Sequence, residues 1–263
     1  MRALVTGAGG RLGAAMAVEL AGLGHDVAVH YAHSAEGAAE TVAAIEGTGR
    51  RSVALQADLL DLDACEALVG RASEALGGPL DMLLNNASIF DHDTLASATR
   101  ETWDRHLGSN LRAPFILIQA FAAQAPAAGE EDGEAVARAC VVNMVDQRVR
   151  KLTPEFMTYT LAKAGLWTLT QTAAQALAPA VRVNAIGPGP TLRATRQTEA
   201  HFAAQRAGTP LERGADAREI CDALRYLVSA KSVTGQLLCV DGGQHLGWRT
   251  PDIVGVEGRA GKT

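Results

Sequence analysis

The stretch TGAGGRLG, residues Thr6–Gly13, follows the apolar run Arg2–Val5 and opens the first predicted helix. Glycines at such a turn let the backbone approach a pyrophosphate, and the helix N-terminus supplies amide donors and a favourable dipole. A turn of this kind at the first βα junction is typical of dinucleotide-binding folds. Nucleotide contacts are therefore expected from Thr6, Gly7, Gly10, Arg11 and Leu12.

Working outward, short β-branched runs alternate with longer helical patterns. Strands are predicted at Arg2–Val5, Asp26–His30, Ser52–Gln56, Asp81–Asn85, Ala139–Asn143, Arg182–Ile186 and Gln236–Val240. Helices are predicted at Arg11–Leu23, Ser34–Glu46, Leu62–Ala75, Glu101–Ala125, Glu155–Ala178 and Asp216–Ser229. This alternation predicts an α/β fold. We expect a single-domain Rossmann-type doubly wound parallel sheet flanked by helices, spanning about residues 1–250.

Length and charge narrow the class of protein. The 263 residues fit one α/β domain, and the net charge of −5 with scattered basic residues argues against a nucleic-acid partner. The apolar segments are too short for a membrane span, and MRALVTGAGG carries no signal-peptide pattern. We therefore expect a cytoplasmic protein with no membrane partner. Its four cysteines are far apart and are expected to be reduced structural thiols.

Several segments interrupt the α/β pattern. GEEDGEA, Gly129–Ala135, is acidic and is predicted to be a solvated loop. Leu192–Arg213 is polar and poorly periodic, so a mobile substrate loop is expected at about residues 190–214. The tail, residues 251–263, is expected to be weakly ordered. The triplet Asp91–Asp93 (DHD) is interpreted as a solvated turn and not a metal site, because adjacent loop residues seldom converge on one ion.

The residues after the second predicted strand indicate which nicotinamide nucleotide is bound. NAD-selective folds place an acid there, which binds the ribose 2′-hydroxyl and repels a 2′-phosphate. This chain has no carboxylate between that strand and Glu36. His33 and Ser34 can donate hydrogen bonds to a phosphate, and Arg11 adds a positive charge nearby. We therefore predict NADP(H) as the cofactor.

Residues at the ends of the second and third strands have simpler alternatives. Asp58 is placed to accept a hydrogen bond from the adenine amino group, with Leu59 beside it, but an aspartate here could instead cap a helix. His30 and Tyr31 are interpreted as residues that pack at the end of a strand.

A second motif carries the chemistry. In NMVDQRVRKLTPEFMTYTLAK, Asn143–Lys163, Asp146 lies thirteen residues before Tyr159, which lies four before Lys163. A four-residue spacing puts the phenol and the ammonium on one helix face. An adjacent ammonium should lower the phenol pKa from its usual value near 10 and make it a usable acid and base. Asn110, in SNLRAP, joins these as a fourth catalytic candidate.

Together the motifs resemble the short-chain dehydrogenase/reductase family over nearly the full length of the chain. The family's landmarks fall on Thr6, Gly7, Gly13, Asn85, Asn86, Ala87, Asn110, Tyr159, Lys163, Pro188 and Gly189. The resemblance implies that Tyr159 exchanges the proton and Lys163 holds the nicotinamide ribose. It implies that Asn110 supports the lysine through a water and a helix irregularity. It also implies a homo-oligomer, expected to be a tetramer.

Two departures make the chain similar to the pteridine reductase branch of that family. Asp146 stands where most members have serine, and Arg11 stands where the usual second glycine would be. This likeness implies a pterin-like substrate that stacks on Phe90, with Ser88, Tyr159 and Asp146 along its reacting edge and Arg11 near its oxygen-rich edge. Further cofactor contacts are implied at Asn86, Ala87, Ser88, Pro188, Gly189 and Thr191.

Alternatives remain open for the residues and for the function. Asp146 could be a loop cap, Phe90 could be core packing, and Thr191 could be a cap. The favoured hypothesis is an NADPH-dependent pterin reductase. The second is a carbonyl reductase acting on a 3-oxoacyl or other ketone substrate, with Asp146 tolerated as a variant. The third is a nucleotide-binding regulator without turnover, which the complete set of Asn110, Tyr159 and Lys163 argues against.

Overall fold

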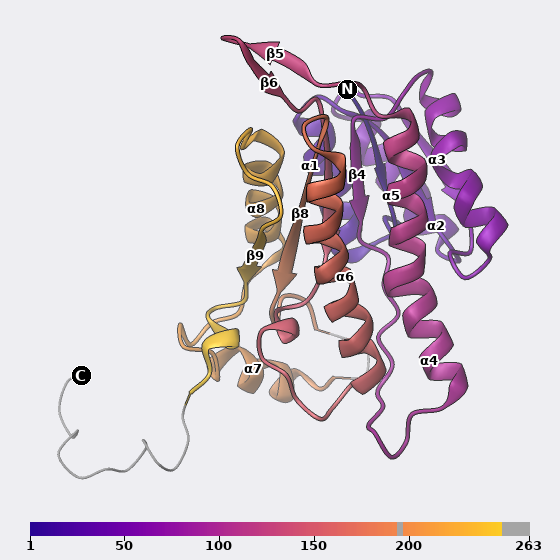
Figure 1. Ribbon diagram of the computed structural model, residues 1–263. Coiled ribbons are helices and arrows are strands. Elements are labelled where there is room, and N and C mark those ends of the chain that lie inside the picture. The colour runs from indigo at the N-terminus through magenta and orange to yellow at the C-terminus, as the bar shows by residue number, and fades with distance from the viewer. Residues whose placement is uncertain (194–196, 249–263) are drawn as a thin grey trace.

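The computed structural model describes residues 1–193 and 197–248, which form a doubly wound α/β domain around one parallel sheet (Figure 1). In this part of the chain seven strands pair in the order β3-β2-β1-β4-β7-β8-β9. Their bounds are β1 Arg2–Val5, β2 Asp26–Tyr31, β3 Ser52–Gln56, β4 Met82–Asn85, β7 Ala139–Met144, β8 Val181–Pro188 and β9 Leu237–Val240. The predicted fold class and all seven predicted strands are confirmed.

Helices cover both faces of the sheet. They are α1 Arg11–Gly22, α2 Ala35–Glu46, α3 Leu62–Leu76, α4 Arg100–Leu107, α5 Ala113–Gln124, α6 Met157–Leu177, α7 Glu199–Ala207 and α8 Ala217–Ser229. Alternate residues of a strand point to opposite faces, so Ala3 and Val5 pack with α1 and α8 while Leu4 packs with α3 and α5. Burial on both faces explains why these strands appear in the sequence as continuous apolar runs.

The chain order reverses between β1 and β4, which are neighbours at the centre of the sheet. In open α/β sheets, ligands bind in the crevice at the carboxyl ends of the strands beside such a reversal. The glycine-rich turn after β1 and the polar residues after β4 therefore meet at the expected ligand-binding edge.

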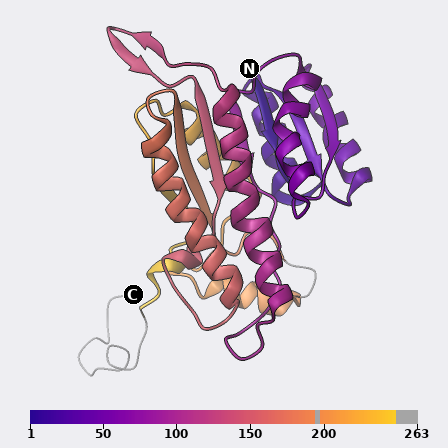
Figure 2. The same ribbon diagram turned by 45° about the vertical axis from the view of Figure 1, so that its right-hand side comes forward.

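Two predicted segments differ in the structure. Gly129–Ala135 was expected to be a loop, but β5 (Gly129–Glu131) and β6 (Glu134–Val136) form an antiparallel hairpin that projects from the body in both views (Figure 1, Figure 2). The sequence signal was Asp132-Gly133, because both residues adopt the positive φ that a tight hairpin turn requires, 51° and 82°. The predicted substrate loop contains the helix α7. Its N-cap is Thr198, whose hydroxyl accepts from the His201 amide.

The long helix predicted at Glu101–Ala125 is interrupted by a π-helical turn, Gly108–Arg112. Pro114 follows this turn and has no amide hydrogen, so it cannot donate to the carbonyl of Asn110 four residues earlier. The helix irregularity that the family resemblance implied at Asn110 is therefore present. The predicted tail, residues 251–263, lies outside the described residues.

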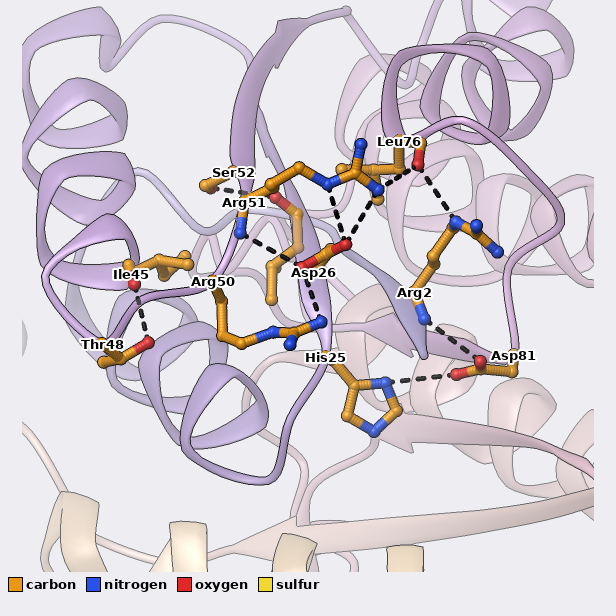
Figure 3. A network of polar contacts seen from close by, with 11 residues as sticks. Arg2, His25, Asp26, Ile45, Thr48, Arg50, Arg51, Ser52, Leu76 and Asp81 are labelled. Carbon is orange, nitrogen blue, oxygen red and sulfur yellow. Dashed lines mark hydrogen bonds and ion pairs between the residues drawn. The ribbon is translucent and has the colours of Figure 1, made fainter.

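At the opposite end of the sheet a polar network ties the strand beginnings together (Figure 3). Asp26, at the start of β2, accepts from the amide and guanidinium of Arg51 and pairs with Arg50 at 2.8 Å. Burial raises the pKa of Asp26, but the hydrogen bonds from Arg51 and the charges of Arg50 and Arg51 outweigh burial and lower it. This network is structural and lies away from the ligand-binding edge.

All four cysteines carry free thiols, and three of them are buried. Across the described ranges, none of the helices combines the length and apolar character that crossing a bilayer would require.

Candidate active site

A cavity of about 1210 Å³ lies at the carboxyl ends of the central strands. Most of the predicted site residues line it: Gly7, Gly10, Arg11, Leu12, His33, Asp58, Leu59, Asn86, Ala87, Ser88, Phe90, Asp146, Tyr159, Lys163, Pro188, Gly189 and Thr191. Three predicted residues, Thr6, Ser34 and Asn110, are not part of its lining. They lie behind it and hold the backbone that forms the wall.

His30, on β2, supports the glycine-rich turn. The Gly7 amide donates to Nδ1 of His30 at 3.0 Å, while Nε2 of the same ring lies 3.1 Å from the Ala57 carbonyl. Burial lowers the pKa of His30, which favours the neutral ring with its proton on Nε2. His30 packs at the strand end as expected, and its two hydrogen bonds were not predicted.

Two glycines of the same turn differ in how closely they are packed. A Cβ at Gly13 would lie 2.2 Å from the Gly7 carbonyl oxygen, whereas a Cβ at Gly10 would meet nothing within 4 Å. Gly13 therefore allows the helix to pack on the strand, and Gly10 leaves open space beside the helix N-terminus. This is the arrangement that a pyrophosphate-binding turn needs.

Thr6 and Asn86 join the ends of β1 and β4. The Thr6 hydroxyl accepts from the amides of Asn86 and Ala87 at 2.9 and 3.0 Å. The Asn86 side chain donates back to the carbonyls of Thr6 and Gly7. These four hydrogen bonds fix the wall on which a nucleotide would lie.

The predicted catalytic groups converge at the far end of the cavity. The Tyr159 hydroxyl donates to Oδ2 of Asp146 at 3.1 Å. Lys163 Nζ donates to the Met144 carbonyl at 2.7 Å and lies 5.7 Å from the centre of the Tyr159 ring. Asp146 follows β7, while Tyr159 and Lys163 lie on one face of α6, so the spacing argument is confirmed.

Burial dominates the electrostatics of these three groups. It raises the pKa of Asp146 despite the opposing charges of Arg148 and Lys163, and it lowers the pKa of Lys163 to about 8. Burial and the neighbouring Asp146 raise the pKa of Tyr159 well above 10. The expectation of a lowered tyrosine pKa was therefore wrong for the chain itself, because desolvation and the carboxyl outweigh the lowering by the charge of Arg148 and by the Ser88 side chain.

Asn110 is fully buried in the π-helical turn. Its side-chain amide donates to the Ile89 carbonyl at 2.8 Å and accepts from the Ile89 amide at 2.9 Å. It therefore pins the segment between Ser88 and Phe90, which lines the cavity. Asn110 acts on this segment as a positioning residue.

Comparison with known proteins agrees with this geometry. The family model described as "Enoyl-(Acyl carrier protein) reductase" matches residues 7–245. The 3-oxoacyl-[acyl-carrier-protein] reductase FabG of Staphylococcus aureus is 32% identical over 249 residues, which cover 93% of this chain and 98% of FabG. The chain belongs to the short-chain dehydrogenase/reductase (SDR) family. It is therefore an oxidoreductase by family.

Two solved SDR structures are also similar to the chain. FolM alternative dihydrofolate reductase 1 from Brucella suis, in complex with NADP, is 41% identical with a TM-score of 0.88, covering 96% of this chain and 98% of that one. A short-chain dehydrogenase from Burkholderia cenocepacia, also with NADP, is 35% identical with a TM-score of 0.83, covering 92% and 97%.

Beside the SDR tyrosine, an aromatic stack lines the cavity. The rings of Phe90 and Phe156 are parallel, with centroids 4.4 Å apart, and Phe90 meets Tyr159 edge-on at 4.6 Å. Phe90 is 38% exposed, so the alternative of simple core packing is wrong for it. The guanidinium of Arg148 covers Phe156 at 5.0 Å.

A buried polar chain fixes the start of the helix that carries Tyr159. The His106 ring accepts from the Asp91 amide through Nε2 at 3.1 Å, and its Nδ1 lies 2.6 Å from the Thr158 hydroxyl. That hydroxyl donates to Oδ2 of Asp93, whose Oδ1 accepts from the Thr158 amide. A neutral ring protonated on Nδ1 satisfies every donor and acceptor in this chain.

The DHD triplet was therefore misinterpreted as a solvated turn. Asp93 is 1% exposed, and its carbonyl also accepts from the amides of Phe156 and Met157. It anchors the first turn of α6, which lacks a side-chain cap at Phe156 itself. His92 remains at the surface, where it pairs with Glu155.

Two other predicted site residues, Arg11 and Ser34, form hydrogen bonds to backbone carbonyls of the chain. Arg11 donates to the carbonyls of Leu192 and Arg193 at 3.3 and 3.4 Å, so it supports the segment after β8. The Ser34 hydroxyl donates to the Gly9 carbonyl at 2.9 Å, which ties α2 to the glycine-rich turn.

The alternatives for the three capping candidates have different outcomes. The cap of α3 is Asp61, and Asp58 instead accepts from the Leu60 amide, so helix capping is wrong for Asp58. The Thr191 hydroxyl donates to the Gly189 carbonyl. Asp146 does cap the short turn Gln147–Val149 by accepting from the Arg148 amide, and it accepts from Tyr159 as well.

Several residues of the site were not predicted from the sequence. Among them are His106, Gln147, Arg148, Phe156 and Thr158. Gln147 is buried and lines the cavity, and its Oε1 has no hydrogen-bond partner among the described residues. Spacing in the sequence gave no signal for His106, whose contacts lie 15 and 52 residues away. Arg148 and Phe156 lie inside the stretch Asn143–Lys163 that carries the catalytic acid and tyrosine, and this position is their signal in the sequence.

Proposed function

We propose that this SDR is an NADPH-dependent reductase that reduces a ring C=N bond of a pterin, such as a dihydropterin or dihydrofolate. The observation that carries the proposal is the carboxyl of Asp146, which accepts from the Tyr159 hydroxyl at 3.1 Å in the place where most SDR members have serine. The aromatic face of Phe90, beside this pair, suits a flat heterocycle.

The residues present fit NADP(H). The open space at Gly10 and the close packing at Gly13 suit a pyrophosphate. His33 lines the same cavity, and the chain has no acid between β2 and Glu36 to repel a 2′-phosphate. Lys163 and Tyr159 would hold the nicotinamide ribose. NADP in the two similar structures supports this choice.

The chain's own residues handle the proton. NADPH would supply a hydride to the ring carbon and become NADP⁺, so the ring nitrogen must gain one proton to balance the reaction. Tyr159 is kept protonated by burial and by Asp146, and it can donate its phenolic proton to that nitrogen. Asp146, whose pKa is raised by burial, can hold a second proton beside the phenol and restore it.

Two relatives favour different substrates. The similar FolM structures carry the name alternative dihydrofolate reductase, which supports a pterin substrate. The similarity to FabG favours a second candidate, reduction of a 3-oxoacyl or other ketone group. Both reactions would use the same cofactor and the same Tyr159 and Lys163. They differ in what they need from Asp146.

Replacing Asp146 by serine separates the two candidates. We expect Asp146→Ser to lower kcat/KM for dihydrobiopterin and dihydrofolate by roughly 10²-fold or more, the usual contribution of a positioned acid or base. NADPH consumption would be followed with both pterins and with a panel of ketones, alongside NADPH binding by fluorescence. Asp146→Asn, which keeps the shape but cannot carry the proton, serves as the matched variant.

Other outcomes of these assays would select one of the alternative functions. Unchanged or improved ketone reduction in Asp146→Ser, with no pterin turnover by the wild type, would select the carbonyl reductase. NADPH binding without oxidation in the presence of any of these substrates would select a regulator without turnover.

A further inference from the structure

Arg148 lies at the outer end of the aromatic stack that begins at the catalytic tyrosine. The order is Tyr159, Phe90, Phe156 and then the Arg148 guanidinium, with successive separations of 4.6, 4.4 and 5.0 Å. All four residues line the same cavity. The guanidinium is therefore two aromatic rings away from the group that handles the proton.

The charge of Arg148 is not neutralised by an ion pair within the described residues. Its Nη1 donates to the uncharged Thr153 hydroxyl at 2.7 Å, and its Nε is buried without a hydrogen-bond partner. Other basic side chains along this part of the cavity have acidic partners, since His92 contacts Glu155 and Arg105 lies 3.9 Å from Asp91. Arg148 thus presents a partly buried guanidinium with unused donors.

The carboxyl of Asp146 does not neutralise the Arg148 guanidinium. It feels the charge of Arg148, which lowers its pKa against the larger effect of burial. Its oxygens, however, accept from the Arg148 backbone amide and from the Tyr159 hydroxyl, and no ion pair joins it to the guanidinium in the part of the chain that the structure describes. A second acid, from outside the chain, would complete the site.

We infer that Arg148 binds a carboxylate on the side chain of the substrate, so that the preferred pterin is a folate-type dihydropterin with an acidic tail. The planar guanidinium matches a carboxylate with two parallel hydrogen bonds. In dihydrofolate an aminobenzoyl ring separates the pterin from its carboxylates. That ring would lie along the Phe90–Phe156 stack while the acid reaches Arg148. This inference rests on the proposed function and adds the substrate class to it.

The test compares two substrates that differ in charge. Dihydrofolate carries carboxylates and dihydrobiopterin does not. In Arg148→Met we expect KM for dihydrofolate to rise roughly fivefold to tenfold, and KM for dihydrobiopterin to change less than twofold. Any effect of Arg148 on Asp146 would change both substrates alike, so the ratio of the two kcat/KM values isolates the tail. Arg150→Met is the control, because it removes a charge from an exposed neighbour outside the cavity.

Equilibrium binding gives a second readout that does not depend on turnover. Folate and biopterin would be titrated into the protein saturated with NADP⁺. We expect Arg148→Met to weaken folate binding selectively and Arg148→Lys to restore part of it. Added salt should weaken folate binding in the wild type and in Arg148→Lys, but much less in Arg148→Met. An equal loss for both pterins, or no change for either, would overturn the inference and leave the proposed function standing. Failure of the wild type to reduce any pterin would overturn both.

Discussion

The Thr158 hydroxyl is the central member of the buried chain that joins His106, Thr158 and Asp93, so its removal tests whether this chain positions Tyr159. Thr158→Val keeps the shape of the side chain and deletes only the hydroxyl. The substitution leaves Oδ2 of Asp93 and the Nδ1–H of His106 without partners in sites that are 1% and 0% exposed.

The expected cost follows from the two orphaned groups. Each buried donor or acceptor left unsatisfied costs about 1–3 kcal/mol. The variant should therefore lose ~2–6 kcal/mol of its free energy of unfolding, a large part of the ~5–15 kcal/mol that a domain has. Tyr159 follows Thr158 directly, and a small displacement of a catalytic group can cost up to about 10² in rate. We expect kcat to fall roughly tenfold to a hundredfold, with KM for NADPH nearly unchanged.

Urea unfolding followed by circular dichroism measures the first effect, and NADPH consumption measures the second. An unchanged urea m-value would show that the denatured state is not responsible. Thr158→Ser is the matched control, because it keeps the hydroxyl and removes one buried methyl group at a cost of about 1 kcal/mol. It should keep most of the wild-type kcat.

The protonation of His106 adds a pH signature. Burial lowers its pKa in the folded protein below the ordinary 6.5, against the charges of Asp93 and Asp91, while Arg105 also lowers it. Its contribution to stability is therefore fully present above about pH 6.5 and is lost as the pH falls through the lowered folded-state pKa. His106→Gln should flatten this slope below about pH 6.5. Thr158→Val with stability within about 0.5 kcal/mol of wild type and an unchanged kcat would refute the positioning argument.

Two other substitutions separate cofactor binding from stability. His30→Phe removes the acceptor of the Gly7 amide. The dissociation constant for NADPH should therefore rise roughly tenfold in a fluorescence titration, which corresponds to the loss of about one hydrogen bond. An unchanged constant would contradict the role of His30. Asp26→Asn weakens the network with Arg50 and Arg51 at the opposite end of the sheet (Figure 3) and should lower the free energy of unfolding by about 1–3 kcal/mol. Its kcat/KM should stay at the wild-type value, and a change there would show that this network reaches the site.

The strands could be predicted because their burial leaves a local signal. Each observed strand end lies within two residues of its prediction, since a parallel strand covered on both faces is a short apolar run with a polar residue at each end. The glycine-rich turn and the spacing of Tyr159 and Lys163 are also local. Local patterns of this kind give the fold and the catalytic helix face.

The missing parts of the site depend on contacts between distant segments. Asp93 is a polar residue in a polar stretch, and only its bonds to Thr158, 65 residues away, explain its burial. The pKa of Tyr159 was wrongly predicted because sequence spacing gives the distance to Lys163 but not the burial of both groups. The π-helical turn was implied only by family likeness, although Pro114 provides a local reason for it.

Asp146 is both the cap of a short turn and the hydrogen-bond partner of Tyr159, two roles that the sequence analysis treated as alternatives. A carboxyl group has two oxygens, and here one accepts from the Arg148 amide while the other accepts from the Tyr159 hydroxyl. A serine in this place would have one oxygen and could donate its proton to a substrate carbonyl. An ionised carboxylate cannot donate, and it would oppose the negative charge that develops on a carbonyl oxygen during reduction. A protonated carboxyl, which burial favours, can instead return a proton to the phenol after Tyr159 has given its own to the substrate. Under the proposed function, Asp146 would therefore serve as the proton reserve for reduction of the C=N bond, while the fold and the cofactor wall stay the same.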